Sequence, residues 1–320
     1  MPAILASAPG KAILFGEHAV VYGRPAIAVP VTQVQVKVSI LADPLGPPGR
    51  VHIQAPDIEL ENDLDNLPAD DPIALAVLGV MRALAADHLP ALHLRVSSTI
   101  PVAAGLGSGA AVSVAILRAL SAFLGHPLPN ETVSELAFEV EKRHHGTPSG
   151  IDNTVVTYAR PIFFTRGQPF EILQPAEAII LIIADSGLKS PTRLAVAGVR
   201  EAWQADPDRY EALFDAIGQV SQRARQLITG GPVLALGPLM TENHHLLQQV
   251  GVSSAELDFL VETALQAGAA GAKLSGAGRG GNMIALAGAE NVEKISTALA
   301  RAGAKRVIIS RVNSVFSEQK

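Results

Sequence analysis

The chemistry of this sequence begins with a cation, a carboxylate and an imidazole close together near the N-terminus. In APGKAILFGEH, Lys11, Glu17 and His18 fall within eight residues, between two apolar runs. A lysine between strands is by default a solvated edge residue. An acid and an imidazole beside it are groups that can bind a polar ligand and move its protons. This segment is therefore the first of three loops that could form one site.

The second loop is PVAAGLGSGAA, residues 101–111, which opens an apolar run with helical spacing. Its small residues allow the backbone to approach an anion, and the free amides of a helix that begins near Ser108 favour negative charge there. The Ser108 hydroxyl could coordinate Mg²⁺ or bond a phosphate oxygen. The lysine of a P-loop and the G-x-G-x-x-G spacing are both absent, so read alone the loop could equally be a packing turn.

The third loop, EKRHHGTPSGID, carries a carboxylate at each end. Glu141 falls late in an expected helix and Asp152 follows a glycine-bounded turn. One carboxylate could hold a metal ion while the other accepts a proton. Alternatively, both are ordinary surface residues of a helix and a turn. A further glycine-rich turn, SGAGRGG at 275–281, lies far along the chain.

Composition limits the kind of protein that carries these loops. The 320 residues are 48% hydrophobic and 17% charged, which suits two domains with filled cores. A formal net charge of -5 offers no global attraction to nucleic acid or an anionic membrane surface. The absence of cysteine excludes disulfides, thiolate metal sites and thiol catalysis. The N-terminal residues lack a signal-peptide pattern and a membrane span, so we expect a soluble, cytoplasmic protein.

The elements that must position these loops follow from hydrophobic periodicity. We expect an α+β chain with a domain boundary near residue 170. The expected strands are AILAS and AILFG as two short runs of an antiparallel layer, 26–40, a hairpin within 43–70, 92–100, NTVVTYA, PIFFTR, 179–184, GAAGAKLS, NMIALAG and KRVIIS. The expected helices are 71–86, 110–124, 130–144, 192–203, 208–228, 232–248, 254–267 and 289–303.

Taken together, the motifs resemble the GHMP kinases, a family of small-molecule kinases. APGKAILFGEHAVVYGRPA, PVAAGLGSGAA and KLSGAGRGGNMIAL match its three motifs in order, from about residue 7 to residue 287. Within the family, FGEHAVVYGRPAIA with HHGTPSGIDN is most similar to the mevalonate kinases. The resemblance implies an N-terminal domain, 1–170, of the ribosomal protein S5 domain 2-like type and a ferredoxin-like C-terminal domain, 171–320, with the site between them.

The resemblance also implies a role for individual residues. Asp152 and Lys11 match the catalytic pair, and Glu141 with Ser108 matches the magnesium ligands. The ATP loop comprises Pro101, Ala104, Gly105, Leu106, Gly107, Ser108, Gly109, Ala110 and Ala111. The substrate residues comprise Lys11, Glu17, His18, Ser149, Asp152, Thr192, Arg193, Gly276 and Gly278, with Arg193 or Lys189 facing the substrate carboxylate. Relatives usually carry GLGSSA, so Gly109 replaces a serine here and Ser108 is the remaining hydroxyl.

The implied reaction is the phosphorylation of mevalonate by ATP with Mg²⁺. We expect the chain to bind neither nucleic acid nor membrane, and its sequence leaves open whether it forms a homodimer. Three alternatives use the same motifs. They are phosphomevalonate kinase or another small-alcohol kinase, the related diphosphomevalonate decarboxylase, and a sensor that binds ATP without turnover.

Overall fold

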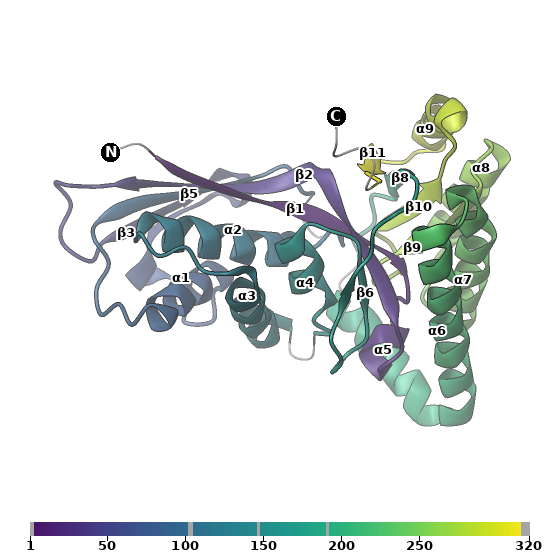
Figure 1. The fold of residues 1–320 in the computed structure, drawn as a ribbon, viewed down its shortest axis with the longest axis horizontal. Coiled ribbons are helices and arrows are strands. Elements are labelled where there is room, and N and C mark those ends of the chain that lie inside the picture. The colour runs from purple at the N-terminus through teal and green to yellow at the C-terminus, as the bar shows by residue number, and fades with distance from the viewer. Residues whose placement is uncertain (1–2, 102–104, 146–147, 190–191, 315–320) are drawn as a thin grey trace. The chain divides into compact units, whose positions relative to one another are not determined.

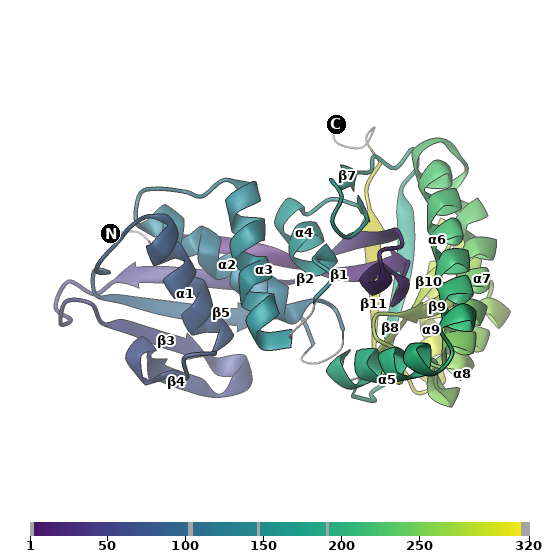
Figure 2. The same cartoon turned by 90° about the horizontal axis from the view of Figure 1, so that it is seen from below.

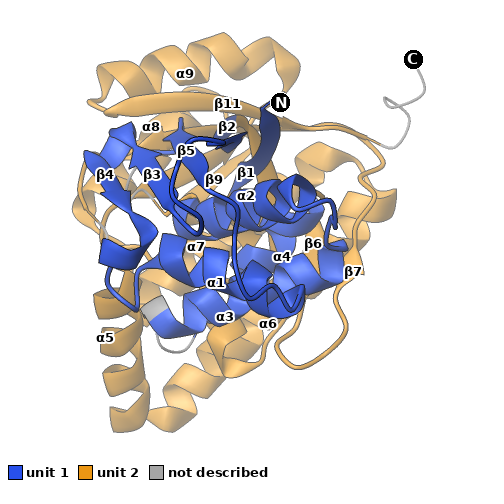
Figure 3. Cartoon of the chain, turned by 90° about the vertical axis from the view of Figure 1, so that its left-hand side faces the viewer, with its two compact units in different colours: residues 1–10, 34–101, 107–159 blue, residues 11–33, 102–106, 160–320 orange. Residues whose placement is uncertain are grey.

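The chain divides into two compact units that are interleaved in sequence (Figure 3). The structure, a computed structural model, describes residues 3–101, 105–145, 148–189 and 192–314. Unit 1 comprises residues 1–10, 34–101 and 107–159, and unit 2 comprises 11–33, 102–106 and 160–320. The units therefore share two long strands, β1 (Ile4–Phe15) and β2 (Ala26–Ala42), whose halves belong to different units.

Unit 1 is a layer of helices on a sheet. Besides its parts of β1 and β2, its elements are β3 (Val51–Ala55), β4 (Leu60–Asp63), α1 (Pro72–Ala83), β5 (Leu92–Ser98), α2 (Ser108–Phe123), α3 (Asn130–His145) and α4 (Ile151–Tyr158). The strand order is β4-β3-β5-β2. Strand β2 is antiparallel to β5, with Val36 opposite Ser98. Figures 1 and 2 show the four helices on one face of these strands.

Unit 2 builds a second sheet from later parts of the chain. Besides the second part of β1 and the first half of β2, its elements are β6 (Ile162–Phe164), β7 (Glu171–Ile172), β8 (Ile179–Asp185), α5 (Thr192–Ala205), α6 (Pro207–Gly230), α7 (Leu236–Val250), α8 (Ala255–Gln266), β9 (Gly271–Ser275), β10 (Asn282–Leu286), α9 (Val292–Arg301) and β11 (Arg306–Val312). The second sheet has the antiparallel order β11-β8-β10-β9. Its core joins alternate residues of β8 to helix residues such as Phe214 and Leu257.

Most expected elements are confirmed, because their caps and periodicity are unambiguous. Helix α1 begins as predicted after Asp71, whose carboxylate accepts hydrogen bonds from the amides of Ile73 (2.8 Å) and Ala74 (3.2 Å). The hairpin within 43–70 is β3 and β4. The strand, glycine turn, strand, helix and strand order after residue 270 is also as predicted.

Two expectations were wrong. NTVVTYA is not a strand: residues 151–158 form helix α4, because Gly150 (φ 94°) turns the chain into a helical start and short apolar runs carry no decisive period. AILAS and AILFG are one strand, β1, which tolerates Pro9. The sequence reading gave no orientation for β3 and β5, which run parallel to each other.

Candidate active site

The first predicted loop lies in unit 2, at the end of β1 and in the turn that follows. Lys11 is only 4% exposed, and its backbone amide donates to the carbonyl of Leu106 at 2.9 Å. The first loop is thereby bonded to the glycine-rich loop. The turn requires Gly16 (φ 95°), because a Cβ there would lie 2.5 Å from the Cα of Ala26.

Glu17 has a partner that the sequence reading did not find. Its side chain is 0% exposed and forms an ion pair with Lys273 of β9, which is also 0% exposed. The other carboxylate oxygen accepts from Nδ2 of Asn243 at 3.4 Å. Burial raises the pKa of Glu17 and lowers that of Lys273, while the attraction between the two charges opposes both shifts.

His18 is held as a neutral imidazole. It is 6% exposed, and its Nε2 donates to the carbonyl of Ala277 at 2.9 Å. A carbonyl can only accept, so Nε2 carries the proton and Nδ1 is left as the unprotonated nitrogen. Burial lowers the pKa of His18 to about 4; the bond to Ala277 opposes this shift, and the charge of Arg279 adds to it.

The third family motif forms a tight turn between β9 and β10 in the same unit. Gly276 (φ 94°) and Gly278 (φ 74°) both occupy the left-handed region. At Gly278 a Cβ would lie 2.0 Å from the carbonyl oxygen of Val252, so no larger residue fits without backbone movement. The amide of Arg279 donates to this same carbonyl at 2.7 Å. The turn is therefore fixed against the segment between α7 and α8.

The glycine-rich loop ends in a helix, as predicted. Gly107 (φ 73°) precedes α2, and among the described residues no side chain caps this helix. Ser108 is the first helical residue and is half-buried, whereas Gly105 and Gly109 are exposed. The uncapped amides and the Ser108 hydroxyl are the groups that an anion or its counterion would meet.

Other residues predicted for this loop have differing environments. Pro101 is half-buried, Leu106, Ala110 and Ala111 are buried, and Ala104 lies outside the described residues. The loop is divided between the two units: Gly105 and Leu106 belong to unit 2, and the residues from Gly107 onwards belong to unit 1.

Both carboxylates of the third loop are in unit 1. Glu141 is 7% exposed on α3, and Asp152 is half-buried in the first turn of α4. Asn153 fixes α4 against α3, since its Nδ2 donates to the carbonyl (3.0 Å) and the hydroxyl (2.9 Å) of Ser134. Ser149 Oγ accepts from the amide of Ile151 at 3.4 Å, before the helix.

The last two predicted residues, Thr192 and Arg193, are exposed at the start of α5 in unit 2. Thus unit 2 brings the first and third family motifs together, and unit 1 holds Ser108, Glu141, Ser149 and Asp152. Within the described ranges, no three His, Asp or Glu residues form a group able to hold a metal ion.

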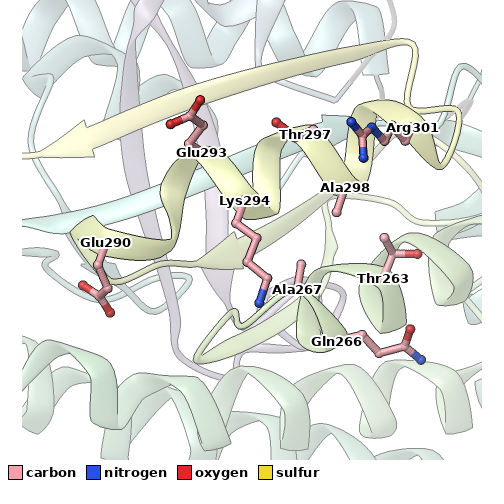
Figure 4. A pocket seen from close by; sticks show the side chains of 9 residues that line it. All are labelled: Thr263, Gln266, Ala267, Glu290, Glu293, Lys294, Thr297, Ala298 and Arg301. Carbon is pink, nitrogen blue, oxygen red and sulfur yellow. The ribbon is translucent and has the colours of Figure 1, made fainter.

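A surface hollow of about 610 Å³ lies elsewhere in unit 2, on α8 and α9 (Figure 4). It is lined by Thr263, Gln266, Ala267, Glu290, Glu293, Lys294, Thr297, Ala298 and Arg301. Its lining contains none of the residues predicted to do chemistry. In the described part of the chain, no helix is both long enough and apolar enough to span a membrane.

Comparison with known proteins defines the class to which this fold and these motifs belong. Residues 74–160 match the family model for the GHMP kinases N terminal domain, and residues 224–305 match that for the GHMP kinases C terminal. The architecture is accordingly the two-domain GHMP kinase fold.

Comparison with individual relatives identifies the group within the GHMP kinases to which the chain is most similar. Mevalonate kinase of Pyrococcus horikoshii is 37% identical, over 94% of this chain and 93% of that protein. Mevalonate kinase of Methanothermobacter thermautotrophicus is 36% identical, over 88% and 89%. The crystal structure of L. major mevalonate kinase in complex with R-mevalonate has a TM-score of 0.83 at 31% identity, covering 98% of this chain and 97% of that one. The chain belongs to the mevalonate kinases of the GHMP kinase family.

Proposed function

We propose that the protein transfers the γ-phosphoryl group of ATP to the C5 hydroxyl of mevalonate, forming 5-phosphomevalonate for isoprenoid biosynthesis. The observation that carries this proposal is the joining of two family motifs in unit 2. There the first motif, with buried Lys11 and neutral His18, is hydrogen-bonded to the β9–β10 segment through the side chain of His18 and through that of Ser275. Membership of the mevalonate kinases supports the choice of substrate.

We propose that unit 1 handles the nucleotide. The loop around Gly107 and the uncapped start of α2 suit the phosphates of ATP, because free backbone amides favour anions. Ser108 and Glu141 fit Mg²⁺, since a hydroxyl and a carboxylate are hard oxygen ligands and Mg²⁺ usually takes few protein ligands beside phosphate oxygens. When bound, Mg²⁺ would supply neutralisation of phosphate charge.

We propose that Asp152 accepts the proton of the C5 hydroxyl and that Lys11 stabilises the developing negative charge. Phosphoryl transfer asks a protein mainly for placement and electrostatic stabilisation. Asp152 offers a carboxylate in the first turn of α4, and a carboxylate can accept the proton of an alcohol as a general base.

The remaining substrate roles are also proposals. His18 and Ser149 offer polar atoms to the hydroxyl groups of mevalonate. Thr192 and Arg193 lie exposed at the start of α5, where a cation and helix amides suit the substrate carboxylate. Gly276 and Gly278 shape the turn that supports His18. We place the protein in the cytoplasm.

The test is turnover of mevalonate, 5-phosphomevalonate, homoserine and galactose with ATP and Mg²⁺, followed by ADP release, with the product identified by ³¹P NMR. We expect ADP release with mevalonate and a phosphomonoester at C5. Preferred turnover of phosphomevalonate, release of carbon dioxide from the diphosphate, or ATP binding without any product would each contradict the proposal.

A further inference from the structure

The buried ion pair between Glu17 and Lys273 has no role in the reaction proposed above. Glu17 and Lys273 are 256 residues apart in sequence, and each side chain is 0% exposed. An unpaired charge at such a depth would be strongly disfavoured, whereas apolar residues of similar size often serve stability equally well. Stability alone therefore does not account for a full salt bridge at this position.

The polar atoms of the pair are directed to protein partners. The ammonium of Lys273 donates to Glu17 and also to the carbonyl of Leu274 at 2.6 Å. The carboxylate of Glu17 receives Lys273 on one oxygen and Asn243 (3.4 Å) on the other. Glu17 thus has no exposed surface with which to meet a substrate.

Two further side-chain bonds join the same two segments as the ion pair. Ser275 Oγ donates to the carbonyl of Ile13 at 2.8 Å, and His18 Nε2 donates to the carbonyl of Ala277 at 2.9 Å. Three ties therefore join residues 13–18 to residues 273–277. Along the first segment the ion pair lies between the other two, and along the second segment it is the first of the three. It is also the one that immediately precedes His18 in the chain.

We propose that Lys273 and Glu17 are positioning residues: their ion pair fixes the turn that presents His18, and Glu17 itself does not bind mevalonate. The kinetic consequence rests on the proposed function, in which His18 contacts the substrate. Displacement of a catalytic or substrate group by about 1 Å can cost about 100-fold in rate, so loss of the tie should be visible in turnover.

The experiment compares E17Q, K273M and the double variant E17Q/K273M. Each single variant leaves one buried charge unpaired, whereas the double variant removes both charges and keeps similar volumes. The matched control is the exposed pair Arg223 and Glu242 (3.0 Å) in the same unit, as R223Q, E242Q and R223Q/E242Q. Kinetic constants for mevalonate and ATP are measured well below the melting temperature of each variant.

We expect each single variant to lose about 10- to 100-fold in kcat/KM for mevalonate, and the double variant to recover to within about fivefold of the wild type. The control variants should remain within about twofold, as is usual for exposed pairs. Equal impairment of E17Q and E17Q/K273M, with K273M near wild type, would show direct substrate binding by Glu17 and overturn the proposal. If K273M does not fold, the double variant decides the question alone. It lacks the Glu17 carboxylate, so it must be impaired if Glu17 binds the substrate directly.

A second readout needs no substrate and separates this proposal from the proposed function. In ¹⁵N-histidine-labelled protein, His18 is assigned by its absence in H18Q. We expect its Nε2–H signal to persist to about pH 5 in the wild type and the double variant, and to be lost or to titrate at higher pH in the folded single variants. An unchanged His18 signal in folded K273M would overturn the positioning role, even if the wild type phosphorylates mevalonate.

Discussion

At the scale of single residues, Asp152 provides the most direct test of the proposed chemistry. Its half-buried carboxylate begins α4, and we expect Asp152→Asn to lower kcat by about 100-fold or more while the fold persists, because general-base contributions are of that size. Steady-state turnover and thermal melting measure the two effects. Asp65→Asn, at an exposed position of the same unit, is the control. Near-normal turnover of the Asp152 variant would exclude the role.

His18 predicts how stability depends on pH. Its pKa is lowered from 6.5 to about 4 in the folded protein, so the unfolded chain binds more protons between these values. Its contribution is therefore present above about pH 6.5 and is lost as the pH falls, by about 2 to 3 kcal/mol at pH 4.5. Urea unfolding at pH 7.5 and 4.5 should show a larger loss for wild type than for H18Q, by about this amount. Equal losses in the two proteins would refute the assignment.

The residue scale also shows where sequence reasoning ends. Glu17 was noticed for its type and its neighbours, but its partner lies 256 positions away. A lysine in KLS, inside a strand whose residues are all buried, was the available signal, since a buried lysine must be paired. Nothing local identifies Glu17 as that partner. The roles of Lys11, Glu141 and Asp152 were carried by motif resemblance and remain predictions.

At the scale of elements, the cap of α1 offers a test of stability that should leave catalysis unchanged. Asp71 accepts from two amides of the first turn, and we expect Asp71→Ala to lower the free energy of unfolding by about 1 kcal/mol. Urea midpoints measure the loss. Asp70→Ala, at the exposed neighbouring position, should change the midpoint little. Equal effects of the two substitutions would contradict a capping role.

Elements with strong local signals were predictable, and α4 was not. The helix that begins at Asp71–Pro72 has a recognisable cap, and β2 has a clear alternation of apolar residues. Each segment is also long enough for its type of secondary structure to be identified. In α4, residues 153–157 are buried without interruption, so neither a period of 2.0 nor one of 3.6 is visible. The helix is set instead by the left-handed Gly150 and by packing against α3, for which Asn153 supplies hydrogen bonds. These are tertiary causes that a strand-like VVT run conceals.

At the scale of the whole molecule, the net charge of the chain predicts that ATP binds together with a cation that offsets its negative charge. The chain has a formal net charge of -5, and ATP is itself an anion. We expect ATP with Mg²⁺ at 100 times its Kd to stabilise the folded state by about 2.7 kcal/mol, seen as a rise in melting temperature. Excess EDTA should abolish this rise and the turnover together, and added Mg²⁺ should restore both. Unchanged turnover in EDTA would contradict a divalent ion in the reaction.

The ion pair between Glu17 and Lys273 has a consequence for recombination. Its two residues are 256 positions apart in the chain. A chimaera with a relative that fills these positions with a different matched pair would inherit one half from each parent wherever the crossover falls between residues 17 and 273. Such a hybrid would hold a mismatched pair and should be less active. We therefore expect the more active hybrids to take residues 17 and 273 from the same parent, which requires either no crossover or two crossovers between these positions.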